Sequence, residues 1–215
     1  DWDGDGDLDL AAATGGGSPV DSADWVWENS WSDSPWTSRS PVWTLPETLG
    51  EAALAVADVT CDGFPDVVVG VDGGADLLYA NPGSILIPSL DGRWQGNSGS
   101  TRAVVAGDLD GDGDADLATA GDGQPVRVWL NDCVNLSLAW TSPLTEGAWD
   151  LDLADYDLDG DLDLAVANGA GSSRVYRNDG GSFTTVWTPT SDGDSRGVAW
   201  GDIDGDGDPD LALAR

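Results

Sequence analysis

Residues 197–214 read GVAWGDIDGDGDPDLALA, which places an acidic loop between two short apolar segments. Within the loop, Asp occupies alternate positions and Gly the sixth, in the pattern DxDxDGxxD. Alternating carboxylates on a tight loop supply the oxygen ligands that a hard cation such as Ca²⁺ prefers. The Gly permits the positive φ that turns the loop back on itself. This stretch therefore predicts two β-strands joined by a metal-binding loop.

The acidic loop recurs five times along the chain, as DWDGDGDLD from Asp1, DVTCDGFPD from Asp58, DLDGDGDAD from Asp108, DYDLDGDLD from Asp155 and DIDGDGDPD from Asp202. Successive copies begin 57, 50, 47 and 47 residues apart. A repeat period near 50 residues is typical of a solenoid or a propeller. We therefore interpret the loops as a property of the whole architecture, and number them 1 to 5 in chain order.

Four short strands recur in phase with the loops. One apolar strand precedes the loop and another follows it, a third ends at an Asn and a fourth carries a Trp; the Asn residues are Asn29, Asn81, Asn131 and Asn178, and the Trp residues are Trp43, Trp140 and Trp187. The second repeat departs from this pattern in its fourth strand. Four antiparallel strands per repeat are typical of a propeller blade. The sequence predicts an all-β, β-propeller-like fold, as a partial ring or a segment of a larger one, with an open tandem array as the alternative.

We expect one repeat domain over residues 1–215. Its units are an incomplete first repeat at 1–50, repeats at 51–100, 101–147 and 148–195, and an incomplete fifth repeat at 196–215. The first unit lacks its opening strand and the last stops after its second strand, so the two ends cannot simply complete one another. An exposed end strand would pair readily with another chain.

Five positions of each loop can surround one cation. The side chains at positions 1, 3, 5 and 9 converge, and position 7 offers its backbone carbonyl. The predicted metal ligands are Asp1, Asp3, Asp5, Asp7 and Asp9; Asp58, Thr60, Asp62, Phe64 and Asp66; Asp108, Asp110, Asp112, Asp114 and Asp116; Asp155, Asp157, Asp159, Asp161 and Asp163; and Asp202, Asp204, Asp206, Asp208 and Asp210. Loop 2 should bind more weakly, because Thr60 replaces a carboxylate, and a terminal ammonium would oppose a cation beside Asp1.

Calcium suits these loops better than other ions do. An EF-hand needs an acidic ligand at position 12 and flanking helices, whereas position 12 here is Ala12, Val69, Thr119, Val166 or Leu213. Zinc prefers His or Cys ligands, and magnesium requires fewer protein oxygens in a more rigid octahedral geometry. We expect about five structural Ca²⁺ ions, one in each loop.

The charge of the chain restricts its partners and its chemistry. Eight basic and 40 acidic residues give a formal net charge of -32. Such an anionic chain is a poor partner for nucleic acid or anionic lipid, and no stretch approaches the ~20 apolar residues of a membrane span. The sequence has no His, the usual acid–base group near neutral pH. Because nearly every clustered Asp belongs to a loop, we expect no enzymatic activity.

Three features leave alternatives open. Cys61 and Cys133, the only cysteines, form either a disulfide, which would fit an extracellular protein, or two unrelated buried thiols. Asp150 and Asp152 alternate with Leu in a first strand, where they face a polar axis or solvent. Five Trp residues crowd the first quarter of the chain and either pack between blades or form a carbohydrate-stacking face: Trp25, Trp27, Trp31, Trp36 and Trp43.

Residues 197–214, together with VYRNDGGSF at 175–183, resemble the FG-GAP/VCBS repeat family, the calcium-loop β-propellers related to the integrin α-subunit head. The resemblance covers nearly the whole chain. It implies blades with calcium held between the first and second strands, and it assigns the same loop residues as ligands. The family's closed rings have more blades than this chain supplies.

The sequence thus predicts a secreted or cell-surface, calcium-binding scaffold or adhesion module. Its partners would be other protein subunits or cell-surface ligands, with self-association through the end strands and carbohydrate as further candidates. One alternative is a calcium-stabilised subunit of a surface fibre or filament. Another, which the resemblance implies, is a non-catalytic propeller domain attached to a carbohydrate-active enzyme.

Overall fold

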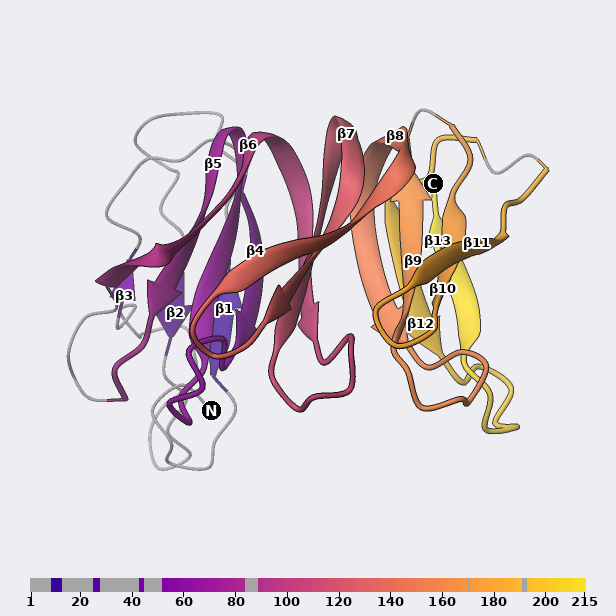
Figure 1. Cartoon of the computed structure of the whole chain (residues 1–215). Helices are drawn as coiled ribbons and strands as arrows, with labels where there is room; N and C mark the ends of the chain where they lie inside the picture. Colours follow the sequence, from indigo (N-terminus) through magenta and orange to yellow (C-terminus); the bar gives the residue numbers. More distant parts are fainter. Residues whose placement is uncertain are drawn as a thin grey trace, which may run out of the picture.

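The computed structural model describes residues 9–12, 25–27, 43–44, 52–83, 89–169, 171–190 and 193–215. These residues form only β-strands, turns and irregular segments, so the predicted all-β class is confirmed (Figure 1). The predicted ligands Asp1, Asp3, Asp5 and Asp7, together with Trp31 and Trp36, lie outside the described residues.

The strands follow one another along the chain as an antiparallel series. They are β1 (Leu10–Ala12), β2 (Trp25–Trp27), β3 (Trp43–Thr44), β4 (Ala52–Ala57), β5 (Asp66–Ala80), β6 (Ser89–Gly107), β7 (Asp116–Asn131), β8 (Leu136–Ala154), β9 (Asp163–Asn168), β10 (Arg174–Asn178), β11 (Phe183–Trp187), β12 (Gly197–Gly201) and β13 (Asp210–Ala214). Hydrogen bonding is continuous from β4 to β11, whereas β1–β3 and β12–β13 form separate sheets.

The long strands belong to two ladders each, because each bends part-way. In β6, residues 89–100 pair with β5 and residues 101–107 pair with β7. In β8, residues 136–147 pair with β7 and residues 148–154 pair with β9. The pairings define five blades: β1–β3; β4, β5 and the first part of β6; the rest of β6, β7 and the first part of β8; the rest of β8 with β9–β11; and β12–β13. We number them blades 1 to 5. Residues 66–71 and 72–80 of β5 are the second and third strands of blade 2, and residues 116–121 and 122–131 of β7 are those of blade 3.

The hydrophobic core lies between successive blades rather than within one sheet. Four clusters of buried side chains join blade 1 to 2, 2 to 3, 3 to 4 and 4 to 5. The second strand of blade 2 shows how the alternation of side chains serves this packing. Val67 and Val69 face the cluster with blade 1, and Val68, on the opposite face, joins the cluster with blade 3. Face-to-face packing of short antiparallel sheets is the arrangement of a propeller.

Aromatic pairs connect each blade to the next in the same way. A fourth-strand Trp meets a third-strand aromatic ring of the following blade edge-on, in the pairs Trp43–Tyr79, Trp94–Trp129 and Trp140–Tyr176, with ring centroids 5.3, 5.7 and 5.2 Å apart. Such pairs contribute about 0.5–1.5 kcal/mol beyond the burial of their area. Trp43 is therefore a packing residue. Trp94 takes this role in the second repeat, whose fourth strand the sequence pattern did not reveal.

Asp150 and Asp152 hold the first strands of blades 4 and 5 together. The backbone N–H of Val198 donates to the Asp150 carboxylate at 3.0 Å, and that of Trp200 donates to the Asp152 carboxylate at 2.7 Å. Both donors belong to β12, which pairs with β13 through its other edge. The two carboxylates thus satisfy edge N–H groups of the neighbouring blade.

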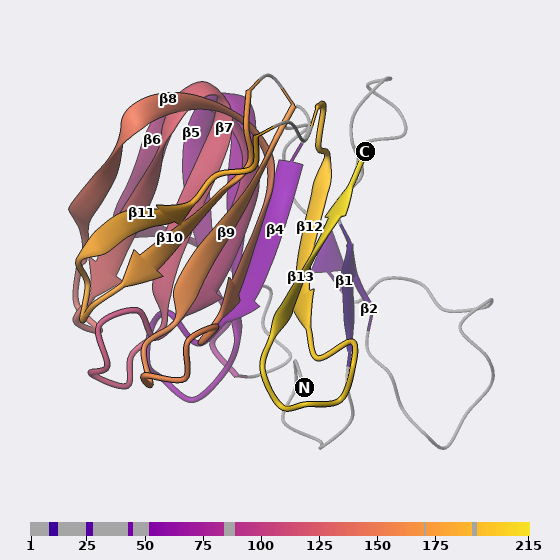
Figure 2. The same ribbon diagram turned by 90° about the vertical axis from the view of Figure 1, so that its right-hand side faces the viewer.

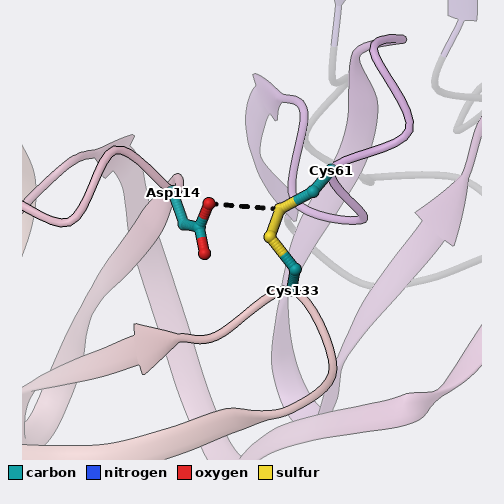
Figure 3. A group of neighbouring side chains, drawn as sticks. All are labelled: Cys61, Asp114 and Cys133. Carbon is teal, nitrogen blue, oxygen red and sulfur yellow. Dashed lines mark hydrogen bonds between the residues drawn. A yellow bond between two sulfur atoms is a disulfide. The ribbon is translucent and has the colours of Figure 1, made fainter.

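Cys61 and Cys133 form a disulfide, with Cα atoms 5.5 Å apart (Figure 3). Cys61 belongs to loop 2 of blade 2, and Cys133 to the turn between β7 and β8 in blade 3. Both residues have positive φ, 56° and 60°. Gly83 and Gly180 take the corresponding turn position in blades 2 and 4, also with positive φ. The bridge therefore joins two left-handed positions of successive blades without changing the turn geometry.

The double substitution Cys61→Ser, Cys133→Ser should lower the free energy of unfolding by about 4 kcal/mol, the loop-closure entropy expected for a bridge of this span. The bridged residues are 72 positions apart. Denaturant titration of both proteins with and without a thiol reductant would measure the difference. The reductant should destabilise the wild-type chain and leave the double variant unchanged. Equal midpoints for wild type and variant would contradict this role of the bridge.

Candidate metal centres

All four described acidic loops project from the same edge of the molecule, the lower edge in Figure 1. Each connects the first strand of its blade to the second: β4 to β5, the end of β6 to β7, the end of β8 to β9, and β12 to β13. The pairing of the two flanking strands continues to the ends of the loop. In loop 2 Ala57 pairs with Asp66, and in loop 3 Gly107 pairs with Asp116. The ladder therefore fixes position 9 of each loop as the first residue of a strand.

Two positions in each loop have left-handed backbone. Position 6 is always Gly, with φ between 91° and 102° in Gly63, Gly113, Gly160 and Gly207. Position 4 is also left-handed, with φ of 56°, 80°, 60° and 79° in Cys61, Gly111, Leu158 and Gly205. The sequence reasoning identified only position 6. The sequence did contain a signal for the left-handed backbone at position 4, because loops 1, 3 and 5 have Gly there.

Backbone N–H groups orient the carboxylates at positions 1 and 5. Asp58 accepts from the N–H of Asp62 at 3.0 Å and from that of Gly63 at 2.8 Å. Asp155 accepts from the corresponding groups of Asp159 and Gly160 in loop 4. The position 5 carboxylate accepts from the N–H of position 7, at 2.9–3.0 Å in all four described loops. These bonds hold the acidic side chains on the inside of the loop.

The position 9 carboxylate is buried in loops 2, 3 and 4. One oxygen of Asp116 accepts from the N–H of Asn131, and the other from the N–H of Leu109, both at 2.7 Å. Asp66 and Asp163 make the same pair of bonds. Each of these three Asp residues has 0% exposed surface. The buried carboxylate therefore links its loop to the end of the third strand of its own blade.

The Asn at the end of the third strand links loops of neighbouring blades, a role that reasoning from turn chemistry missed. The Asn131 amide donates to Ala115 O of its own loop at 3.1 Å and to Val59 O of loop 2 at 2.9 Å. The Asn178 amide donates to Leu162 O at 3.1 Å and to Leu109 O of loop 3 at 2.7 Å. Adjacent loops are thus connected through one buried side chain.

The structure brings three of the predicted ligands of each of loops 3, 4 and 5 close together. Carboxylate oxygens lie within 4.8 Å of one another in the groups Asp108, Asp110 and Asp116; Asp155, Asp157 and Asp163; and Asp202, Asp204 and Asp206. Positions 1, 3 and 9 meet in loops 3 and 4, and positions 1, 3 and 5 in loop 5. Asp112, Asp159 and Asp210 are outside these groups.

Loops 1 and 2 differ from the others. Among the described residues, Asp58, Asp62 and Asp66 form no comparable group, in keeping with the substitution of Thr60 for a carboxylate. The Thr60 hydroxyl oxygen is buried and interacts with the Asp66 carboxylate, so an oxygen occupies position 3 of loop 2. Of loop 1 only Asp9 is described, and it is half-buried.

Position 7 was predicted to bind through its carbonyl, and two of its side chains have other contacts. Asp161 accepts from the N–H of Gly180 at 2.8 Å. An oxygen of Asp114 lies 3.5 Å from the Cys61 sulfur (Figure 3). Because a bridged sulfur carries no hydrogen, this approach is a contact rather than a hydrogen bond. The same bridge excludes Cys61, Cys133 and Asp114 as a metal site, since both thiols are consumed.

The electrostatics of the loops favour a cation. Burial raises the pKa of Asp116 to about 6, with Asp110 and Asp112 adding to the shift and backbone N–H groups opposing it. Burial also raises the pKa of Asp163 to about 6, with Asp157 and Asp159 adding to the shift. A bound divalent cation would relieve both causes. The donor set, all oxygen and mostly carboxylate, fits a hard ion such as Ca²⁺.

Comparison with known proteins agrees with this geometry. The family model for the FG-GAP-like repeat matches residues 1–69, 108–166 and 155–213. The chain belongs to the FG-GAP-like repeat family. The matches begin at loop 1, 3 or 4 and run through the second strand of the following blade. No curated protein sequence is significantly similar to the chain.

A solved structure shares the fold of this FG-GAP-like chain. The crystal structure of BBS1N in complex with ARL6DN, soaked with lead, superposes with a TM-score of 0.55 at 16% sequence identity. The match covers 95% of this chain and 58% of that chain, so the FG-GAP-like chain spans less than two thirds of the length of its structural neighbour. The likeness confirms the β-propeller-like fold.

The calcium-free FG-GAP-like chain should become less stable as the pH rises from 5 to 7.5. The folded state raises the pKa of Asp116 and Asp163 from 3.8 to about 6. Folding therefore retains protons that the unfolded chain releases, and this stability is lost as the pH rises through the folded pKa. Thermal melts in chelator at both pH values measure the effect. The double variant Asp116→Asn, Asp163→Asn should show a smaller difference, and an equal one would contradict the assignment.

Proposed function

We propose that the chain is a calcium-stabilised extracellular scaffold or adhesion module, in which Ca²⁺ fixes the loop of each blade. The observation that supports this most directly is the repetition of one arrangement. The carboxylates of positions 1 and 3 meet a third carboxylate in three successive loops, all on one edge of the molecule. Repetition on three successive blades suits a structural ion better than a single active centre.

The proposed ligands are the side chains at positions 1, 3, 5 and 9 with the carbonyl of position 7. Bound calcium would neutralise carboxylates that otherwise repel one another at the end of each blade. In loops 3 and 4 the position 9 ligand also binds the third strand, and Asn131 and Asn178 connect each of these loops to the preceding one. Calcium would thereby stabilise both the blade and its junction with its neighbour.

Two features support a location outside the cell. The Cys61–Cys133 disulfide joins blades 2 and 3, and disulfides of this kind persist in oxidising compartments. Extracellular calcium, which is millimolar, fills loops whose affinity is too low for the cytosol.

In the described part of the chain, no helix is long and apolar enough to cross a membrane.

Protein partners, rather than substrates, are the proposed ligands of the module. One of its structural neighbours, BBS1N, is a propeller-like chain solved in a complex with ARL6DN. A non-catalytic role is also proposed, since the two carboxyl groups with the most strongly raised pKa are each held by two backbone N–H groups and belong to metal loops.

Calorimetric titration of the chelator-treated chain with Ca²⁺ tests the proposal. We expect several sites per chain with dissociation constants on the order of 10⁻⁴–10⁻³ M, as in extracellular calcium modules. Asp108→Asn with Asp110→Asn should remove one site and leave the others. A chain that takes up no calcium at 5 mM, or a variant with unchanged stoichiometry, would refute calcium binding by these loops.

A further inference from the structure

The Cys61–Cys133 disulfide lies among the acidic loops, which occupy the lower edge of the molecule in Figure 2 as in Figure 1. Cys61 takes position 4 of loop 2, between the proposed ligands Thr60 and Asp62. Cys133 lies two residues after Asn131, whose side chain connects loop 2 to loop 3. The bridge therefore joins one metal loop directly to the turn that holds the next.

Loop 2 offers a cation a weaker set of ligands than loops 3 and 4 do. Thr60 supplies a hydroxyl at position 3, where both of the other loops have a carboxylate. The Asp66 carboxylate accepts from three backbone N–H groups, whereas the Asp116 carboxylate of loop 3 accepts from two. The three acidic ligands of loop 2 also do not meet in one group, as those of loops 3 and 4 do. Affinity in loop 2 thus depends more on how firmly the loop itself is held.

The next junction has the same kind of hydrogen bonding without a bridge. There the Asn178 side chain connects loops 3 and 4, and its Oδ1 accepts from the N–H of Gly181 at 2.8 Å. The Asn131 Oδ1 is held in a similar way by the N–H of Cys133, at 3.1 Å. Position 4 of loop 3 is Gly111, which has no side chain to link it to blade 4. The disulfide is therefore an addition to this arrangement, made at a loop that lacks a carboxylate.

The bridge is open to solvent and fixes an unfavourable backbone conformation. Cys61 is exposed and Cys133 is half-buried, so a reductant can reach the sulfur atoms. The φ of 56° at Cys61 is costly for a residue other than Gly. A dithiol reductant would transfer two electrons and two protons to the bridge, giving two thiols and the cyclic disulfide of the reductant. Position 4 of loop 2 would then lose its covalent link to blade 3.

We propose that the disulfide is a redox-sensitive control of calcium binding by loop 2, which rests on the proposed function of the loops. In the bridged state Cys61 is held in place, and with it the flanking ligands Thr60 and Asp62, so less order has to be gained when the ion binds. Reduction removes this pre-organisation and lowers the calcium affinity of loop 2, whereas loops 3, 4 and 5 have no bridge at position 4 and keep theirs. By linkage, calcium in loop 2 protects the bridge from reduction by the same factor.

Calorimetric titration of the whole chain with Ca²⁺, before and after reduction with dithiothreitol, tests the proposal. Reduction should weaken one site at least about fivefold and leave the other sites unchanged. The double variant Asp58→Asn, Asp62→Asn removes two carboxylates of loop 2 and should give the same titration in both states. The matched variant of loop 4, Asp155→Asn with Asp159→Asn, should keep the difference between the two states. Circular dichroism reports whether the reduced chain is folded.

The equilibrium between the bridge and dithiothreitol measures the same coupling without the need for a folded reduced chain. The ratio of reduced to oxidised protein, determined by thiol trapping, should be at least about fivefold lower in 5 mM Ca²⁺ than in chelator. The loop 2 variant should lose more of this protection than the loop 4 variant does, because its missing site is the one that the bridge holds.

Identical titrations of the oxidised and reduced chains, with other loops still taking up calcium, would overturn the redox control and leave the proposed function intact. An equal loss of protection in the loop 2 and loop 4 variants would overturn it as well. A chain that takes up no calcium in either state would overturn both the redox control and the proposed function.

Discussion

Removal of calcium should lower the melting temperature of this protein by on the order of 20 °C. In 5 mM calcium, with dissociation constants on the order of 10⁻⁴–10⁻³ M, each site adds about 1–2.3 kcal/mol, so four occupied loops add about 4–9 kcal/mol. For a chain of this size, 1 kcal/mol shifts the melting temperature by about 2–4 °C. The shift is large because the ions would act on four successive blades, and because the ion-free loops bring together the carboxylates of a chain with a formal net charge of -32.

Differential scanning calorimetry in 5 mM Ca²⁺ and in excess EGTA measures the shift. Equal concentrations of Mg²⁺ in place of Ca²⁺ should restore little of it, since Mg²⁺ demands stricter octahedral geometry and keeps several waters. Re-addition of Ca²⁺ to the chelated sample should recover the original melt. A melting temperature that is the same in chelator and in calcium would refute a structural role for the ion.

Asp116→Ala should be among the most damaging single substitutions in the loops, with a loss of about 3–5 kcal/mol in the presence of calcium. The carboxylate is fully buried and accepts from the N–H groups of Leu109 and Asn131. Truncation therefore leaves two buried donors unpaired in addition to removing a proposed ligand. Denaturant titration in calcium would give the change in the free energy of unfolding.

Asp208→Ala is the matched control, because it removes a carboxylate from position 7 of loop 5, where only the backbone carbonyl is a proposed ligand. Asp208 is exposed, so we expect a change within about 0.5 kcal/mol. Asp116→Asn keeps the shape of the side chain and should fall between the two. If Asp208→Ala cost as much as Asp116→Ala, then position 9 would have no special role.

The local features of the fold could be predicted from the sequence, because a metal loop with its two flanking strands is contiguous. The period of the loops, the all-β class and the Gly at position 6 needed no knowledge of distant contacts. The left-handed backbone at position 4 was missed, since Cys61 and Leu158 conceal a preference that Gly111 and Gly205 display.

The junctions between blades could not be predicted, because they join residues far apart in the sequence. The disulfide spans 72 residues, and so does the hydrogen bond from Asn131 to Val59. Nothing in the composition of the third strand separates an Asn that ends a turn from an Asn that connects two loops. Trp94 was likewise hidden, since the Gly- and Ser-rich residues around it do not resemble the fourth strands of the other repeats.

The central claim is that the acidic loops hold structural calcium, and anomalous diffraction from crystals grown in calcium tests it most directly. We predict anomalous peaks in loops 3, 4 and 5, each surrounded by the carboxylates of positions 1, 3, 5 and 9 and the carbonyl of position 7 at about 2.3–2.6 Å. A weaker peak is expected in loop 2, where Thr60 replaces a carboxylate. Loops that show no anomalous density at saturating calcium, in an otherwise unchanged fold, would contradict the account.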